Sequence, residues 1–211
     1  MTTHFYTAAS LDGFIATEEH SLAWLFEQDF DPNGPMAYPA FIDGIGALVM
    51  GASTYEWLLR SGEPWGYMQP TWVFTHRELA VPEGADVRFV SGDPAGPFQT
   101  IVASAEGKDV WVMGGGELAS QFADAGLLDE IWVQFAPVTL GSGRPLFASA
   151  LQLELIDVVR NRDFVCTRYL VRKDNSLTLL EQIREERSDL PERNTPYRPA
   201  AMVAGIAYGC P

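Results

Sequence analysis

The sequence is poor in positive charge. Its 211 residues include only two lysines, Lys108 and Lys173, and the formal net charge is -14. Nucleic acid is therefore a poor candidate partner, because neutralising its phosphates requires clustered lysine and arginine side chains. A small phosphorylated ligand is compatible with this composition, since a few arginines and helix N-termini can hold it.

Cysteine, histidine and long apolar runs are also scarce. The two cysteines lie far apart, and the three histidines (His4, His20 and His76) lack the spacing of a metal site, so no metal is predicted. No apolar run reaches the roughly 20 residues that a membrane-spanning helix requires. The chain does not open with a secretory signal pattern. We expect a reduced, cytoplasmic protein without a membrane partner.

Strand-like and helical segments alternate through much of the chain. Compact apolar runs predict strands, and apolar residues at helical spacing predict helices. Three strand-like runs without an intervening helix follow. The pattern predicts an α/β fold with a mixed, mostly parallel central sheet and antiparallel C-terminal strands. The predicted strands are 4–10, 47–51, 71–75, 87–91, 109–114, 131–138, 153–160 and 164–172, and the predicted helices are 52–60, 96–107 and one that begins at 117 and stops at Gly126.

The composition changes beyond Asp174. Residues 177–190 are compatible with an amphipathic helix, but "PERNTPYRPA" at 191–200 carries three prolines and cannot form regular structure. We expect one domain over residues 1–174. Residues 175–211 are expected to form an appendage that is packed on the surface or partly disordered.

Three strand-to-helix junctions are the candidate binding elements: "VMGAST" at 49–54, "VFTHRE" at 73–78 and "VMGGGE" at 112–117. Glycines that open a helix expose unpaired backbone N–H groups, which suit phosphate. Each junction alone could equally be a tight turn, and Ser53 or Thr54 could be a plain N-cap. Together they lie at the carboxyl edge of an open sheet, where ligands bind, so a dinucleotide fits them. The glycine spacing does not match the Rossmann fingerprint.

Five blocks of sequence carry a resemblance to a known group of proteins. They are "TAASLDGFIA" (7–16), "LVMGASTYEWL" (48–58), "WVFTHR" (72–77), "VWVMGGGELASQFADAGLLDEI" (110–131) and "PVTLGSGRPLF" (137–147). In this order the chain resembles the dihydrofolate reductase-like superfamily, and most closely the bacterial proteins related to the C-terminal reductase domain of riboflavin biosynthesis. The similarity covers about residues 3–173.

The resemblance implies a three-layer, NADPH-binding fold with the cofactor across the sheet. It implies phosphate contacts at the first junction, 2'-phosphate contacts at the second, for which an arginine is physically suited, and pyrophosphate and ribose contacts at the third. A cis peptide bond between two glycines of the third junction is also implied. The implied cofactor-binding residues are Ala8, Ile15, Gly51, Ser53, Thr54, Thr75, His76, Arg77, Gly114, Gly115, Gly116, Glu117 and Leu118.

Two residues depart from the pattern of the relatives. Many relatives have arginine where this chain has Ala52, so a preference for NADPH over NADH would rest on His76 and Arg77. The riboflavin reductases usually carry glutamate where this chain has Met113. That difference argues against the riboflavin-pathway substrate.

The substrate side offers weaker candidates. Asp12 is the candidate catalytic residue for proton transfer, although "LDG" also fits an ordinary turn. Trp24 could stack on a flat heterocycle, although such aromatics are more often core residues, and Arg144 could contact an anionic group. By analogy we also expect a homodimer, with the strand "IWVQF" against the second subunit.

The resemblance implies an NADPH-dependent reductase that transfers a hydride to a small, heterocyclic, pterin- or pyrimidine-like substrate. Hydride transfer needs little from a protein beyond positioning the nicotinamide and excluding water. The alternatives are a nucleotide-binding module without turnover and a riboflavin-pathway pyrimidine reductase.

Overall fold

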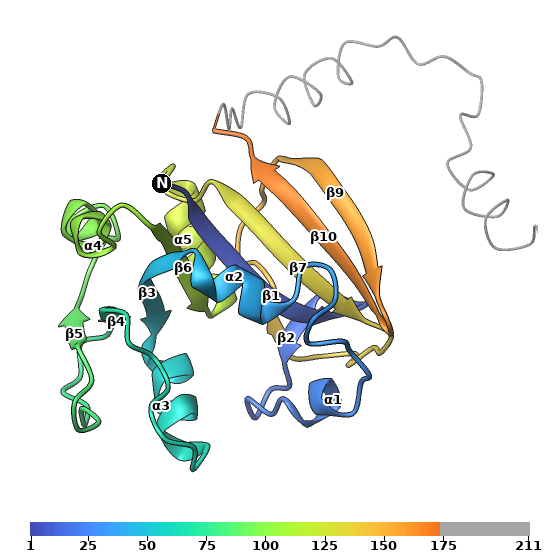
Figure 1. The fold of residues 1–211 in the computed structure, drawn as a ribbon, viewed down its shortest axis with the longest axis horizontal. Coiled ribbons are helices and arrows are strands. Elements are labelled where there is room, and N and C mark those ends of the chain that lie inside the picture. Colours follow the sequence, from blue (N-terminus) through green and yellow to red (C-terminus); the bar gives the residue numbers. More distant parts are fainter. Residues whose placement is uncertain (174–211) are drawn as a thin grey trace, which may run out of the picture. The chain divides into compact units, whose positions relative to one another are not determined.

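An eight-stranded sheet runs through the computed structural model, which describes residues 1–173 (Figure 1). The strand order is β5-β4-β3-β6-β1-β7-β10-β9. Neighbouring strands from β5 to β7 are parallel, and β10 is antiparallel to both β7 and β9. The predicted mixed, mostly parallel sheet with antiparallel C-terminal strands is confirmed. The appendage predicted at 175–211 lies outside the described residues.

The strands and helices follow the predicted alternation. The strands are β1 (Thr3–Ser10), β2 (Phe14–Ala16), β3 (Ile45–Gly51), β4 (Thr71–Phe74), β5 (Val87–Val90), β6 (Asp109–Gly114), β7 (Glu130–Ala136), β8 (Arg144–Pro145), β9 (Leu153–Asn161) and β10 (Phe164–Val171). The helices are α1 (Ala23–Phe26), α2 (Tyr38–Asp43), α3 (Ala52–Arg60), α4 (Phe98–Ser104) and α5 (Gly116–Asp124).

The parallel strands are buried on both faces, which explains their continuous apolar sequences. In β3, Val49 belongs to the core cluster that includes residues of α4 and α5. Its neighbour Met50 belongs to a second cluster, with Phe41 of α2 and Tyr55 of α3. Because successive side chains of a strand point to opposite faces, these clusters lie on the two sides of the sheet. Helices therefore cover both faces, which gives the three layers.

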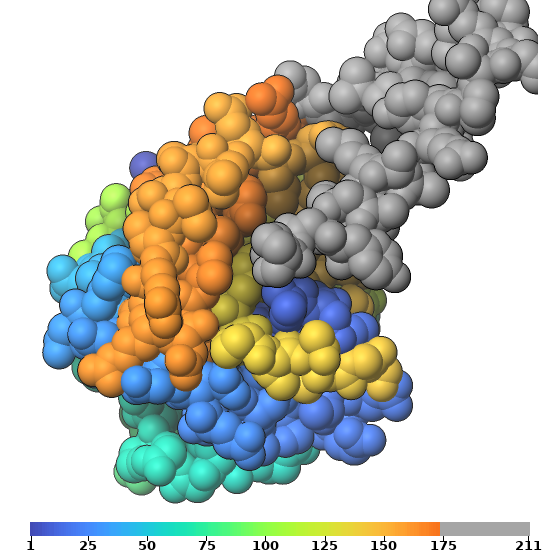
Figure 2. All heavy atoms as spheres, turned by 90° about the vertical axis from the view of Figure 1, so that its right-hand side faces the viewer, coloured from blue at the N-terminus to red at the C-terminus, as the bar shows by residue number. Residues whose placement is uncertain are grey.

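The antiparallel end of the sheet carries exposed apolar side chains. Figure 2 shows β9 and β10 (orange) at the surface of the face that it displays. More than two-fifths of each of five side chains is exposed there: Leu155, Ile156, Val158, Val165 and Leu170. In β7, which contains the "IWVQF" segment expected to meet a second subunit through one face, Ile131 and Val133 are buried in the core of their own chain, and Trp132 and Gln134 on the other face are half-buried.

Some short elements were not predicted. Strands β2 and β8 form a separate two-stranded sheet in which Ala16 pairs with Arg144. Two or three residues are too few to show a periodic pattern, so the sequence carried no signal for them. Helix α2 is also new. Helix α5 ends at Asp124, two residues before the predicted stop at Gly126, which has a φ of 69°. Among residues 1–173, no helix has the length and apolar character needed to cross a bilayer.

Candidate functional site

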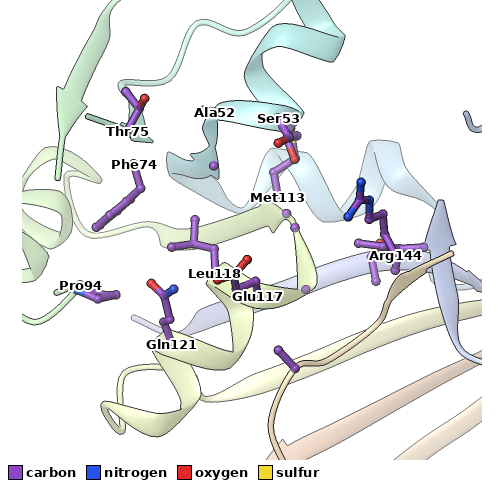
Figure 3. A pocket seen from close by; sticks show the side chains of 18 of the residues that line it. Ala52, Ser53, Phe74, Thr75, Pro94, Met113, Glu117, Leu118, Gln121 and Arg144 are labelled. Atoms are coloured by element: carbon purple, nitrogen blue, oxygen red, sulfur yellow. The ribbon is translucent and has the colours of Figure 1, made fainter. Parts of the chain in front are cut away.

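A cavity of about 1120 Å³ lies at the carboxyl ends of the parallel strands. Residues at or just after the ends of β3, β4, β5 and β6 line it, together with the first turns of α3 and α5. Residues of β2 and β8 line it as well. In the close view of Figure 3, Ser53 of α3 and Leu118 of α5 lie around the middle of the cavity, and Thr75 and Arg144 lie toward opposite sides. The cavity is therefore long, and it follows the sheet edge where the sequence places a ligand.

Two helix N-termini meet in this cavity. Helix α3 begins after Gly51, and α5 begins after Gly115. Neither helix start has a side-chain cap hydrogen bond from the described part of the chain. Met50 pairs with Gly114 across the sheet, so the two junctions are neighbours. The backbone N–H groups of both first turns can therefore act together on one anionic ligand.

The three glycines of the third junction differ in their structural roles. Gly114 has a φ of 153°, which other residues rarely adopt, and its peptide bond to Gly115 is cis, as the resemblance implied. A Cβ on Gly116 would overlap the carbonyl oxygens of Pro145 and Leu146. A Cβ on Gly115, by contrast, would meet nothing nearer than Ile15 Cδ1 at 3.9 Å. Of the three, Gly115 leaves its backbone accessible from the cavity.

Most of the residues implied by the resemblance lie together in the cavity lining. These are Ile15, Gly51, Ser53, Thr54, Thr75, His76, Gly114, Gly115, Gly116, Glu117 and Leu118, together with the substrate candidate Arg144. Four others lie outside the lining: Ala8, Asp12, Trp24 and Arg77. For Ala8 the reason is the alternation of the strand, because its neighbour Thr7 lines the cavity instead.

Asp12 has a structural role in the loops at this edge. Its carboxylate accepts hydrogen bonds from the backbone N–H groups of Leu140 (3.1 Å) and Gly141 (2.7 Å) and from the hydroxyl of Ser10 (2.6 Å). The bond from Ser10 is the main cause that holds the pKa of Asp12 below its usual range. A carboxylate that is ionised and engaged in this way is poorly suited to donate a proton. Its position matches the ordinary turn residue considered above.

Trp24 is a core residue. Only 8% of it is exposed, and it packs in a cluster with Ala136, Phe164 and Cys166. It cannot stack on a ligand in the cavity without leaving this cluster. Trp57 of α3 is the tryptophan that lines the cavity among residues 1–173, one turn beyond the phosphate-binding candidates Ser53 and Thr54.

Arg77 follows Thr75 and His76 at the end of β4, but its guanidinium is turned toward α3. It donates hydrogen bonds to both carboxylate oxygens of Glu56, at 2.9 and 3.0 Å. Its backbone N–H donates to the Thr75 hydroxyl at 3.0 Å. The arginine expected to contact a 2'-phosphate is therefore paired with a carboxylate at the border of the cavity.

Arg144 is held by the small sheet. It pairs with Ala16 across β2 and β8, and its guanidinium donates to the carbonyl oxygen of Glu18 at 3.1 Å. This contact connects β8 to the loop at 17–21. His20 from the same loop lines the cavity, with a φ of 62°.

Sequence reasoning missed the loop that follows β5. Ser91, Gly92, Asp93 and Pro94 all line the cavity. The rule that placed ligands at the carboxyl ends of parallel strands applies equally to β5 and was sufficient to find this loop. His20, Met113 and Gln121 are further lining residues not assigned to the site.

Comparisons with known proteins agree with this architecture. Residues 66–169 match the model of the RibD C-terminal domain family. The uncharacterized protein YwjB of Bacillus subtilis (strain 168) is 34% identical over 146 residues, which cover 69% of this chain and 82% of YwjB.

Two solved structures show the same fold. One is a protein from Shewanella sp. PV-4 proposed to act in riboflavin biosynthesis, with a TM-score of 0.71, 28% identity, and coverage of 82% of this chain and 99% of that chain. The other is dihydrofolate reductase from Enterococcus faecalis complexed with NADP(H), with a TM-score of 0.51, 16% identity, and coverage of 81% and 96%. The sheet and its edge cavity thus define a protein of dihydrofolate reductase-like fold. More particularly, the chain belongs to the RibD C-terminal domain family.

Proposed function

We propose that the protein is an NADPH-dependent reductase that transfers a hydride to a small, heterocyclic, pterin- or pyrimidine-like substrate. The observation that carries this proposal is the pair of uncapped helix N-termini side by side in a long cavity. One phosphate-binding junction serves many ligands, but two adjacent ones suit a ligand with linked phosphates. The family membership and the NADP(H) complex of the dihydrofolate reductase neighbour support the same choice.

The lining fits a dinucleotide in shape and chemistry. A Cβ added at Gly51 or Gly115 would have its nearest neighbour at 3.9 Å, an ordinary van der Waals contact, and both residues line the cavity. A pyrophosphate there would accept hydrogen bonds from the first-turn N–H groups of α3 and α5. The hydroxyls of Ser53 and Thr54 add donors, and Ile15 offers an apolar contact for the nicotinamide. When bound, NADPH supplies the hydride.

Reduction of a C=N bond also consumes one proton. Asp12 is engaged with Leu140 and Gly141. We therefore assign the proton to His20, the titratable residue that the loop at 17–21 contributes to the lining. Imidazole is suited to this task, because its ring nitrogens can hold and donate a proton.

Two other functions are alternatives to an NADPH-dependent reductase. A nucleotide-binding module without turnover is favoured by Ala52, which offers no cationic donor at the start of α3. A riboflavin-pathway pyrimidine reductase is favoured by the proposed role of the Shewanella protein and disfavoured by Met113, which lines the cavity where the riboflavin reductases usually carry glutamate.

A hydride-transfer assay tests the proposal. NADPH deuterated at the transferable position is incubated with the protein and reduced-pterin or pyrimidine acceptors, and deuterium in the product is measured by mass spectrometry. Acceptor-dependent oxidation with deuterium transfer supports the reductase. Binding of NADPH without any transfer supports the binding module, and the absence of binding refutes both.

The expected homodimer is also a proposal. Exposed apolar side chains at the antiparallel end of the sheet, among them Val158 of the edge strand β9, support it. Sedimentation of the wild type against Val158→Lys separates a dimer through this surface from a monomer.

A further inference from the structure

The ion pair between Glu56 and Arg77 joins the two elements that flank one end of the cavity. Glu56 belongs to α3, whose first turn lines the cavity. Arg77 directly follows Thr75 and His76, which line it beyond β4. The contact is bidentate, with Nη1 at 2.9 Å from Oε1 and Nη2 at 3.0 Å from Oε2. This is the strongest geometry that an arginine and a carboxylate can form.

The pair affects how strongly this end of the cavity can bind a phosphate. Hydrogen bonds from Arg77 are the main cause that holds the pKa of Glu56 below its usual range, so the carboxylate is ionised at neutral pH. A second carboxylate, Asp93, lines the cavity from the loop after β5. That loop is adjacent, because the N–H of Thr75 donates to Val90 at 2.7 Å. Two carboxylates thus lie at this end with two guanidinium groups, Arg77 and Arg60, the second of which also acts on the charge of Glu56, so a dianion meets no excess of positive charge here.

In this ion pair, Glu56 occupies Nη1 and Nη2 of Arg77, the two nitrogens that would otherwise form a bidentate contact with a phosphate. A phosphate on the adenosine ribose at this end must either displace Glu56 or accept a poorer contact with Arg77. A ribose with a free hydroxyl needs no guanidinium and meets no repulsion. Glu56 therefore weakens the binding of NADPH more than the binding of NADH.

We propose that Glu56 determines the coenzyme selectivity of this site by holding Arg77 in an ion pair, which keeps the preference for NADPH over NADH small. The proposal rests on the proposed function, since it assumes that a nicotinamide dinucleotide occupies the cavity. In this proposal Glu56 opposes the binding of NADPH, so removing its charge should tighten NADPH binding.

Dissociation constants of NADPH and NADH, measured by calorimetric titration of the full-length chain, test this without turnover. For Glu56→Gln we expect NADPH to bind about fivefold more tightly, the upper value for a solvent-exposed ion pair such as this one, and NADH to change less than about twofold. In the double variant Glu56→Gln/Arg77→Gln the gain should disappear. The matched control is Asp86→Asn, because Asp86 forms an equally bidentate pair with Arg88 away from the cavity lining.

Three outcomes overturn the proposal. An unchanged or lower ratio of NADPH to NADH affinity in Glu56→Gln would show that the carboxylate does not restrain Arg77. A gain that persists without Arg77, or that Asp86→Asn reproduces, would show a general charge effect. If the wild type binds neither coenzyme, the proposed function fails as well, whereas the other outcomes leave it standing. Circular dichroism melts confirm that each variant is folded.

Discussion

Gly116 packs so closely against Pro145 that a Cβ on the glycine would overlap the proline carbonyl oxygen. This contact attaches the start of α5 to the small β2–β8 sheet, and so connects the phosphate-binding junction with the opposite side of the cavity. The glycine is needed for packing between elements, whereas a Cβ on Gly51 or Gly115 would clash with nothing, its nearest neighbour being at 3.9 Å. The glycine-rich sequence therefore combines a folding requirement with a binding surface.

Substituting these glycines should separate the two roles. Gly116→Ala forces backbone apart and should lower the free energy of unfolding by about 3 kcal/mol, at the upper end of the usual cost of overpacking. Gly51→Ala, at a φ of -82° and with no atom closer to the new Cβ than 3.9 Å, should cost no more than about 1 kcal/mol through the weaker N-cap. Urea denaturation measures both. Equal losses would contradict the different packing of the two sites.

Asp12 should matter for stability and not for proton transfer. Asp12→Asn places an amide against the N–H groups of Leu140 and Gly141 and should lower the melting temperature at pH 7. Because the folded-state pKa is lowered, the stabilisation is present above the ordinary value of 3.8 and is lost as the pH falls below it. The difference in melting temperature between wild type and variant should therefore shrink at acid pH.

The control for Asp12 is Glu19→Gln, whose side chain makes no hydrogen bond within residues 1–173. It should leave the melting temperature unchanged across the same pH range. A difference for Asp12→Asn that grows toward acid pH would show that the carboxylate is not held in its ionised form.

His20 should affect turnover and not coenzyme binding. His20→Asn keeps a residue type that tolerates the positive φ of 62° but removes the titratable group. We expect the rate of hydride transfer to fall about a hundredfold, the lower range for loss of a general acid, with the NADPH dissociation constant unchanged. An unaltered rate would exclude His20 as the donor.

The sheet was predictable because its strands are apolar on both faces and end at glycine or polar breakers. Runs such as 47–51 and 109–114 show this pattern directly, and their glycines mark where the helices begin. The carboxyl edge, and with it the general location of the cavity, followed from this order of elements.

The side-chain partners in the site were not predictable in the same way. The pairing of Arg77 with Glu56 depends on how β4 and α3 are placed in space, and the two residues are 21 positions apart. The contacts of Asp12 with Leu140 and Gly141 span more than 120 positions. The burial of Trp24 depends on β10, at the far end of the described chain. Local patterns carry no record of such contacts.

The central claim is that one nicotinamide dinucleotide binds along this cavity, and ligand-dependent thermal stability tests it most directly. NADPH at a hundredfold its dissociation constant should stabilise the folded wild type by about 2.7 kcal/mol. Gly51→Leu, which fills the space between the two helix starts, should abolish the shift while remaining folded. A wild-type melting temperature that neither NADPH nor NADH raises, or an undiminished shift in Gly51→Leu, would contradict the account.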